Sequence, residues 1–195
     1  MFIPSHFHIS EQEEIDRFIA QNSFGILVSQ HEGELLATHL PVHRIDEDRM
    51  QAHIARANPQ WQQIDGQRVL IILPGPHDYV SPKWYESEGV PTWNYQTVHL
   101  YGHATCFTDP DKLRELVMTL SNTYEASREE PWQGEFDERM LKAIVGIEFR
   151  IESIECKFKL SQNRSRADQE RVSKELERAG NTQLAEAMRK HKQLD

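Results

Sequence analysis

The sequence predicts a small antiparallel β-barrel with peripheral helices, an α+β architecture. About six segments carry strand patterns, and turn signals of only a few residues separate them. Strands joined by such short turns pair antiparallel, because a parallel pair needs a long crossover. Helical patterns occur at the front, between strands and at the end of the chain. The 195 residues suit one barrel domain, which we expect over 1–165, with 166–195 forming a C-terminal helical extension packed on it.

The front of the chain predicts one helix followed by three strands. Ser10 and Glu13 form a capping-box pattern, in which each side chain caps the other residue's backbone amide. Apolar residues at helical spacing then predict an amphipathic helix from Ser10 to about Gln21. Turn residues separate the apolar and alternating segments that come next. These strands are expected at 24–29, 35–45 and 50–55.

The middle and the end of the chain predict further helices and strands. Asn58-Pro59 predicts the start of a short helix, with Asn58 at the N-cap and proline in the first turn. The β-branched run 68–73 predicts a strand covered on both faces, which Pro74-Gly75-Pro76 ends. Gly180-Asn181 breaks a C-terminal helical hairpin. The other expected elements are strands at 97–107 and 145–160, a helix capped by Asp109, and helices at 137–143, 166–179 and 182–192.

Charge is distributed unevenly along the chain. Residues 1–156 carry a net charge of −13 and residues 157–195 a net charge of +4, which together give −9. An acidic body repels nucleic acid, so only the C-terminal segment is a candidate for binding it. A solvated helical face of mixed charge is the favoured interpretation of that segment.

Cysteine usage and hydropathy predict a cytoplasmic protein. Cys106 and Cys156 are the only cysteines, too few for a disulfide framework and suited to a reducing compartment. The N-terminus lacks the basic and apolar regions of a signal peptide. No apolar stretch approaches the roughly 20 residues that span a bilayer.

An aromatic segment rich in proline lies between Val80 and Gly102. It holds Trp84 and Trp93 together with tyrosines, two prolines and Asn94. Proline fixes the backbone angle φ and removes an amide donor, so a shaped loop is expected here. Aromatic faces beside polar side chains suit a flat ligand. A loop that plugs the end of a barrel with bulky residues is an equally good interpretation.

Three polar clusters lie at expected strand ends or turns, at 37–43, 53–61 and 157–164. In the second cluster, Arg56 precedes the helix start at Asn58, and a guanidinium beside free backbone amides suits a phosphate. Pairing of Arg56 with an acidic neighbour, and a purely capping role for Asn58, are the alternatives. The third cluster is basic and rich in amides, which is also typical of a solvated strand end.

Most catalytic and metal-binding patterns are missing from the sequence. The ten histidines include pairs four residues apart, but these pairs lie on expected strands, so no metal site is predicted. No Gly-x-Ser-x-Gly, Gly-x-Gly-x-x-Gly or Walker loop occurs. Catalytic residues therefore stay unassigned, with His39, His99 and Tyr95 as the only acid–base candidates.

Seven motifs follow one another along the chain: 37–41 (ATHLP), 53–61 (HIARANPQW), 79–85 (YVSPKWY), 90–95 (VPTWNY), 98–102 (VHLYG), 144–146 (IVG) and 159–164 (KLSQNR). Together they resemble the PaiB family, known as FMN-binding negative transcriptional regulators, from Met1 to about Leu176. The resemblance implies an FMN-binding split barrel of the pyridoxamine-phosphate-oxidase type. It also implies a homodimer, with flavin in interface grooves that both chains contact.

The same resemblance implies which residues hold the cofactor FMN. Thr38, His39 and Leu40 would line the strand beneath the isoalloxazine, and His53, Ala55, Arg56, Asn58 and Gln60 would hold the ribityl chain and phosphate. Trp84, Trp93 and Asn94 would close the ring end, and Lys159, Gln162 and Asn163 would come from the C-terminal strand of the partner chain.

The function implied by the resemblance is repression of transcription, of the sporulation and protease-synthesis type. Its partner would be DNA or a regulatory protein, and the acidic body counts against direct operator binding. Whether the chain is an enzyme stays open. A flavin-dependent oxidoreductase acting on a small molecule, a haem-binding split-barrel protein with His103 as ligand, and simple FMN storage or detoxification are the alternatives.

Overall fold

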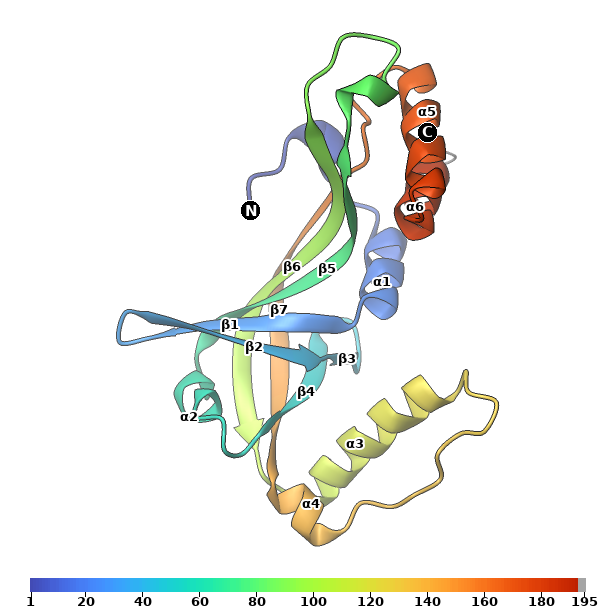
Figure 1. Ribbon diagram of the computed structural model, residues 1–195. Coiled ribbons are helices and arrows are strands. Elements are labelled where there is room, and N and C mark those ends of the chain that lie inside the picture. Colours follow the sequence, from blue (N-terminus) through green and yellow to red (C-terminus); the bar gives the residue numbers. More distant parts are fainter. Residues whose placement is uncertain (193–195) are drawn as a thin grey trace. The chain divides into compact units, whose positions relative to one another are not determined.

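The computed structural model describes residues 1–192 and contains a seven-stranded antiparallel sheet with helices around it (Figure 1). The strand order is β2-β1-β5-β6-β7-β4-β3. The strands are β1 (Phe24–His31), β2 (Glu34–Pro41), β3 (His43–Arg44), β4 (Arg49–Ala55), β5 (Arg68–Val80), β6 (Thr92–Phe107) and β7 (Ile144–Lys159). The helices are η1 (Ser5–Phe7), α1 (Gln12–Gln21), α2 (Gln60–Ile64), η2 (Pro82–Trp84), α3 (Pro110–Glu125), α4 (Glu138–Lys142), α5 (Arg166–Arg178) and α6 (Thr182–Lys192).

The chain divides into two compact units, and the three longest strands run through both. One unit holds residues 1–22, 74–99 and the chain from Glu155 onward; the other holds 23–73 and 100–154. The boundary expected near residue 165 stays a prediction, and residues 193–195 of the expected extension lie outside the described residues. Within 1–192, no helix is both long and apolar enough to cross a membrane.

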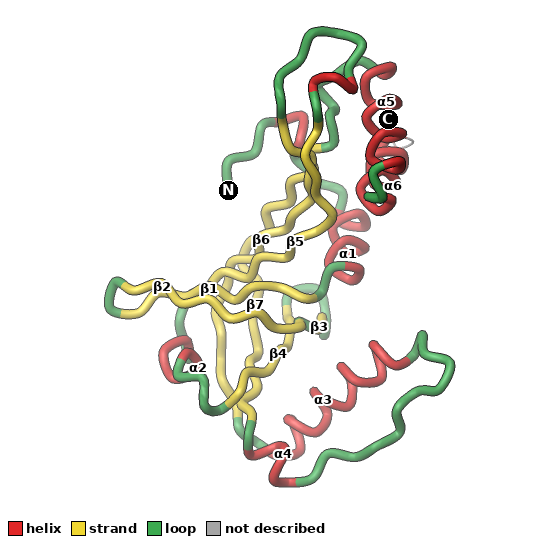
Figure 2. The backbone as a smooth tube through the Cα atoms, in the orientation of Figure 1, coloured by secondary structure: helices red, strands yellow, loops and turns green. Residues whose placement is uncertain are grey.

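In the unit formed by 23–73 and 100–154, short connections produce the predicted antiparallel pairs. The β1–β2 hairpin pairs Phe24 with Pro41, and its tight turn contains Gly33 at φ +89°, a conformation that glycine adopts without strain. β2 also contacts β4 from the opposite end of the strand order, so the sheet curls toward a barrel. Figure 2 shows that a long loop joins α3 to α4.

In the unit that contains both termini, amphipathic helices cover the ends of the long strands. The apolar positions predicted for α1, Ile15, Phe18 and Ile19, are buried. The ring of Phe18 packs 5.1 Å from the ring of Phe158 on β7. The helical hairpin of α5 and α6 turns at Gly180, at φ +90°, as predicted.

Several local predictions were wrong. The shaped loop expected between Val80 and Gly102 extends only to Pro91, because β6 begins at Thr92 and lies inside the sheet between β5 and β7. Strand β5 continues through Pro74-Gly75-Pro76. On the edge that faces β1 it is paired only at 70–72, so the absence of amide hydrogens at the two prolines breaks no hydrogen bond to β1. Along 68–73 only alternate residues are fully buried, so this strand has one well-covered face. The capping box does not form: Glu11 is the N-cap of α1, and the Ser10 hydroxyl donates to the Glu11 carboxylate.

Gly102 on β6 is expected to be intolerant of a side chain. A Cβ at this position would overlap the backbone carbonyl oxygen of Arg150 on β7. We expect Gly102→Ala to lower the free energy of unfolding by about 1–3 kcal/mol, because two paired strands must separate to admit the methyl group. Thermal unfolding followed by circular dichroism measures the change.

Gly134→Ala is the matched control for this prediction. A Cβ at Gly134 would meet the side chain of Trp132, which is half exposed and can move. A melting temperature that falls equally in both variants would show that the contact with Arg150 is not the cause.

Candidate functional site

Strand β2 positions the first group of expected site residues. Its side chains alternate as predicted: Leu40 is buried in the core, Thr38 is half-buried, and His39 lies exposed on the opposite face. The His39 ring stacks against Phe24 of β1, with centroids 6.4 Å apart and planes inclined by 28°. This face of the hairpin therefore carries exposed aromatic side chains that a ligand or another chain can contact.

Thr38, Asn58 and Gln60 form one hydrogen-bonded network. The Thr38 hydroxyl donates to Gln60 Oε1 and accepts from Asn58 Nδ2 at 2.9 Å. Gln60 is only 1% exposed, and its Nε2 donates to the Ser29 hydroxyl at 2.9 Å. Gln60 therefore holds Thr38 from inside the protein, which orients the hydroxyl and amide that remain half-buried.

The helix start at Asn58 differs slightly from the prediction. Pro59 is the N-cap and α2 begins at Gln60, whose backbone amide donates to Asn58 Oδ1 at 3.0 Å. Asn58 therefore lies one residue before the N-cap, where its side chain closes a local turn by accepting from the Gln60 amide. α2 is also a single short turn, so it adds little dipole to the site.

Arg56 lies directly after β4 and is tied to the backbone that begins β7. Its Nε donates to the carbonyl of Lys142 at 2.6 Å and its Nη2 to the carbonyl of Ile144 at 3.0 Å. No carboxylate among residues 1–192 forms an ion pair with Arg56, and its Nη1 makes no hydrogen bond there. A half-buried guanidinium, fixed in place and still carrying free donors, is suited to an oxyanion.

His53 and Ala55 precede Arg56 on the same strand. Ala55 is exposed at the strand end, whereas His53 is half-buried and faces the opposite way from Ile54. Within the described chain, Nδ1 of His53 is buried without a hydrogen-bond partner. Burial lowers the pKa of His53, so the neutral imidazole is the favoured form. This unpartnered nitrogen, three residues before Arg56 in the chain, is available to a ligand.

Acid should destabilise the protein through His53. The pKa of His53 in the folded chain is below its ordinary value of 6.5, so the unfolded chain takes up the proton first as the pH falls. The free energy of unfolding should therefore decrease below about pH 6.5 and continue to decrease until folded His53 is itself protonated. Urea unfolding at about pH 7.5 and 5.5 should show a smaller decrease for His53→Gln than for wild type. The exposed His31→Gln is the control, and an equal decrease in wild type and His53→Gln would contradict the assignment.

The remaining six expected residues belong to the other unit. Asn94 is fully buried and its Nδ2 donates to the Ser161 hydroxyl at 2.9 Å, so it joins β6 to the end of β7. Trp93 is 54% exposed, and its ring meets Tyr79 edge-on with centroids 6.2 Å apart. Trp84 is half-buried on η2.

Three of those six residues come from the end of β7 and the turn after it. Lys159 Nζ donates to the Thr92 hydroxyl at 2.6 Å, and burial is the main cause that lowers the pKa of Lys159. Gln162 caps the strand end, accepting from the Leu160 amide at 2.7 Å and donating to the Phe158 carbonyl at 2.6 Å. Asn163 is exposed. The strand end is therefore an ordered turn, in which Lys159 and Gln162 are already held by protein groups.

Sequence reasoning missed a cavity of about 370 Å³ in the same unit, lined by residues of α1 and α6. Its walls come from segments far apart in the chain, and no motif marked them. Within residues 1–192, the cavity included, no group of three or more His, Cys, Asp or Glu side chains is arranged to hold a metal ion. His103, the candidate haem ligand, lies 2.8 Å from the carboxylate of Glu152.

Two comparisons of sequence identify relatives. The model of one protein family, described as "Putative FMN-binding domain", matches residues 1–153. The protein "Protease synthase and sporulation protein PAI 2" of Bacillus subtilis (strain 168) is 39% identical over 200 residues, which cover 96% of each chain.

Solved structures share the fold. The FAD and Heme binding protein from Mycobacterium smegmatis matches with a TM-score of 0.65 at 14% identity, covering 78% of this chain and 73% of that one. A "Putative Pyridoxamine 5'-phosphate oxidase" from Listeria innocua matches with a TM-score of 0.50 at 16% identity, covering 75% and 98%. These likenesses confirm the predicted split barrel of the pyridoxamine-phosphate-oxidase type.

Proposed function

The chain belongs to the PaiB-type family of FMN-binding domains, and from that membership we propose that it is a cytoplasmic, homodimeric flavoprotein that represses transcription. The observation that carries the flavin assignment is Arg56. Its guanidinium is half-buried, fixed by two backbone carbonyls and free of any carboxylate within residues 1–192. FMN ends in a phosphate, the group that such a guanidinium binds best.

The donors around Arg56 suit the rest of FMN. Asn58 and Thr38 offer a half-buried amide and hydroxyl to the ribityl chain, while Gln60 orients them from the core. His53 contributes an unpartnered nitrogen, and Ala55 leaves room at the strand end. Bound FMN supplies a ring that accepts and donates electrons. The chain's own contribution is to bind and orient that ring. The segment of β2 from Thr38 to Leu40 would lie beneath it, with the side chain of His39 exposed and that of Leu40 buried in the core.

The family resemblance assigns six further residues to FMN, and all of them belong to the other unit. Trp84, Trp93 and Asn94 would close the ring end, and the large exposed face of Trp93 supports this role. Lys159, Gln162 and Asn163 would be contributed by the partner chain of the dimer. The ordered turn after β7 supports their use as fixed contacts.

Visible absorbance and an FMN titration test the flavin assignment. We expect a flavin spectrum in the purified protein or, after removal of the flavin, saturable quenching of FMN fluorescence at about one FMN per chain. A protein that shows neither would not be a flavoprotein.

The exposed apolar face of the β1–β2 hairpin supports the homodimer. β2 is an edge strand, and the side chains of Leu35 and Phe24 are 72% and 60% exposed. Exposed edge strands with apolar side chains are usually covered by another chain. Light scattering should give twice the 22.8 kDa mass of one chain, and a mass of one chain would contradict the dimer.

Charge favours repression through a protein partner. Five cations of α5 and α6 pair with glutamates, and the pairs are Arg166–Glu170, Arg171–Glu86, Arg178–Glu175, Arg189–Glu177 and Lys190–Glu186. These pairs reduce the positive charge that the two helices offer to phosphates, and the whole chain carries −9. The Bacillus subtilis relative, named for protease synthesis and sporulation, supports a regulatory role.

Two measurements separate direct from indirect repression. Deleting the gene should raise the transcripts that the protein controls, whereas the purified protein should not shift its own promoter DNA in gels at about 150 mM salt, with or without FMN. A specific shift at that salt would assign DNA as the direct partner. Unchanged transcripts would exclude repression.

A further inference from the structure

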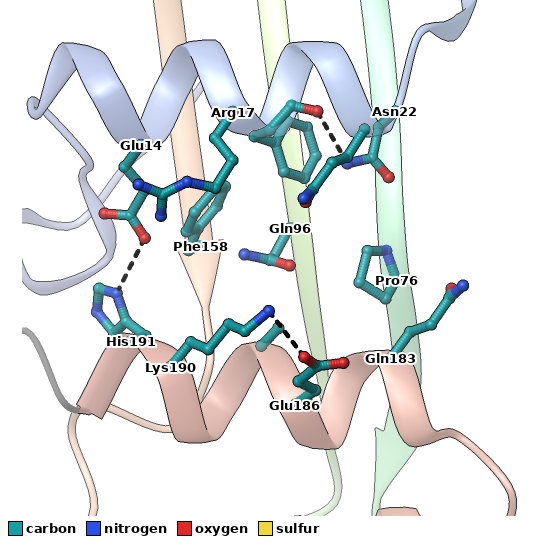
Figure 3. Close-up of a pocket in the computed structure, with 13 residues that line it drawn as sticks. Glu14, Arg17, Asn22, Pro76, Gln96, Phe158, Gln183, Glu186, Lys190 and His191 are labelled. Atoms are coloured by element: carbon teal, nitrogen blue, oxygen red, sulfur yellow. Dashed lines mark hydrogen bonds and ion pairs between the residues drawn. The ribbon is translucent and has the colours of Figure 1, made fainter. Parts of the chain in front are cut away.

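The cavity lined by α1 and α6 is a second ligand site, and we propose that it binds a small aromatic carboxylate. None of the fourteen residues expected to hold FMN lines it. Figure 3 shows the two helices facing each other across it, with side chains of β5, β6 and β7 behind. Its volume of about 370 Å³ lies within the usual range for small-molecule pockets.

Aromatic and proline side chains form one part of the cavity wall. Phe18 of α1 and Phe158 of β7 pack with ring centroids 5.1 Å apart and ring planes inclined by 49°, and Pro76 of β5 lines the same cavity. Aromatic and proline faces favour a planar apolar body over a flexible polar one. This surface accommodates the ring of the ligand.

The charges that face the cavity leave one cation without a partner. Glu186 is bound by Lys190, with Nζ 2.7 Å from the carboxylate, and Glu14 lies 3.6 Å from the ring of His191. Arg17 also lines the cavity, and no carboxylate within residues 1–192 forms an ion pair with it (Figure 3). A carboxylate matches the guanidinium fork of Arg17, which forms no ion pair within the described residues.

Gln96 adds a hydrogen-bonding group to the cavity. Its side chain extends from β6 into the space between the helices, as Figure 3 shows. The amide of Gln96 makes no hydrogen bond within the described residues. A carboxylate or a polar ring substituent of the ligand can accept a hydrogen bond from this amide. That bond would replace the one the amide makes to water before the ligand binds.

Titration calorimetry with three probes tests the site. Benzoate carries both the ring and the charge, benzamide lacks the charge, and acetate lacks the ring. We expect benzoate to bind with a Kd of about 1 mM or below, and the other two probes at least about tenfold more weakly. Benzamide that binds as well as benzoate, or the absence of benzoate binding, would overturn the proposal.

Three variants locate the binding. Arg17→Gln should weaken benzoate about tenfold or more through the lost charge-assisted bonds. Ala187→Phe should abolish binding by filling the cavity, since Ala187 lines it from α6. Arg166→Gln, on α5 and outside the cavity, is the control and should bind as wild type does. Unchanged binding in Arg17→Gln and Ala187→Phe would place the benzoate elsewhere.

Two further readouts separate this site from the flavin site. Because the ligand would hold α6 against α1, benzoate should slow amide hydrogen exchange within Thr182–Lys192. Benzoate should also leave FMN fluorescence quenching unchanged. Competition between benzoate and FMN would mean that the cavity belongs to the flavin site, and unchanged exchange in α6 would contradict the helix contact.

Discussion

Replacing Arg56 with alanine should weaken FMN binding about 10- to 100-fold. Charge-assisted hydrogen bonds contribute about 1.5–3 kcal/mol each, and alanine removes all of those that Arg56 would make to the phosphate. The variant should also lose about 1–3 kcal/mol of stability, because the carbonyls of Lys142 and Ile144 lose their donors. FMN fluorescence quenching gives the affinity, and urea unfolding without FMN gives the stability.

Two other arginine variants separate binding from folding. Arg56→Lys keeps the charge but loses the fork, so we expect an affinity between those of the wild type and the alanine variant. Arg68→Ala removes an exposed arginine of the same unit, whose Nε lies 3.1 Å from Glu152, and should leave FMN binding unchanged. Equal affinity in wild type and Arg56→Ala would remove Arg56 from the phosphate site.

Replacing Gln60 with methionine should lower the free energy of unfolding by about 2–3 kcal/mol. Methionine fills a similar volume, but it leaves the Thr38 hydroxyl without its acceptor and Ser29 without its donor. For a chain of this size the melting temperature should fall by about 4–12 °C. FMN affinity should also fall, because Thr38 and Asn58 lose the group that orients them.

Gln62→Met is the matched control on the same short helix. Gln62 is exposed, so its replacement should change stability by no more than about 0.5 kcal/mol. If Gln60→Met lost stability while FMN affinity stayed unchanged, the network would be structural only. If neither quantity changed, the hydrogen bonds of Gln60 would have no energetic role.

Local patterns predicted local structure well. The spacing of Ile15, Phe18 and Ile19 predicted α1, and all three side chains are buried. Asp109 was expected to cap α3, and its carboxylate accepts from the Lys112 amide at 2.9 Å. These signals succeed because periodicity and capping depend on residues within about four positions of each other.

Local rules failed where a distant strand decided the outcome. Proline was expected to end β5 at Pro74, yet the strand continues to Val80 because β1 pairs with it only at 70–72. Gln60 stays a predicted FMN residue, and the structure adds that neighbours on β1 and β2 hold its side chain in the core. Neither outcome follows from the residues adjacent in sequence.

By itself, the sequence determined the helices, the hairpins, the split-barrel class and membership of an FMN-binding family. These follow from short-range periodicity, turn residues and the order of the motifs, all of which can be recognised in the amino-acid sequence itself. Only the tertiary structure decided that Arg56 is anchored by carbonyls at the start of β7, and that Arg17 and Gln96 line one cavity with α6. Such partnerships join residues tens of positions apart, and only the packing of distant segments brings them together.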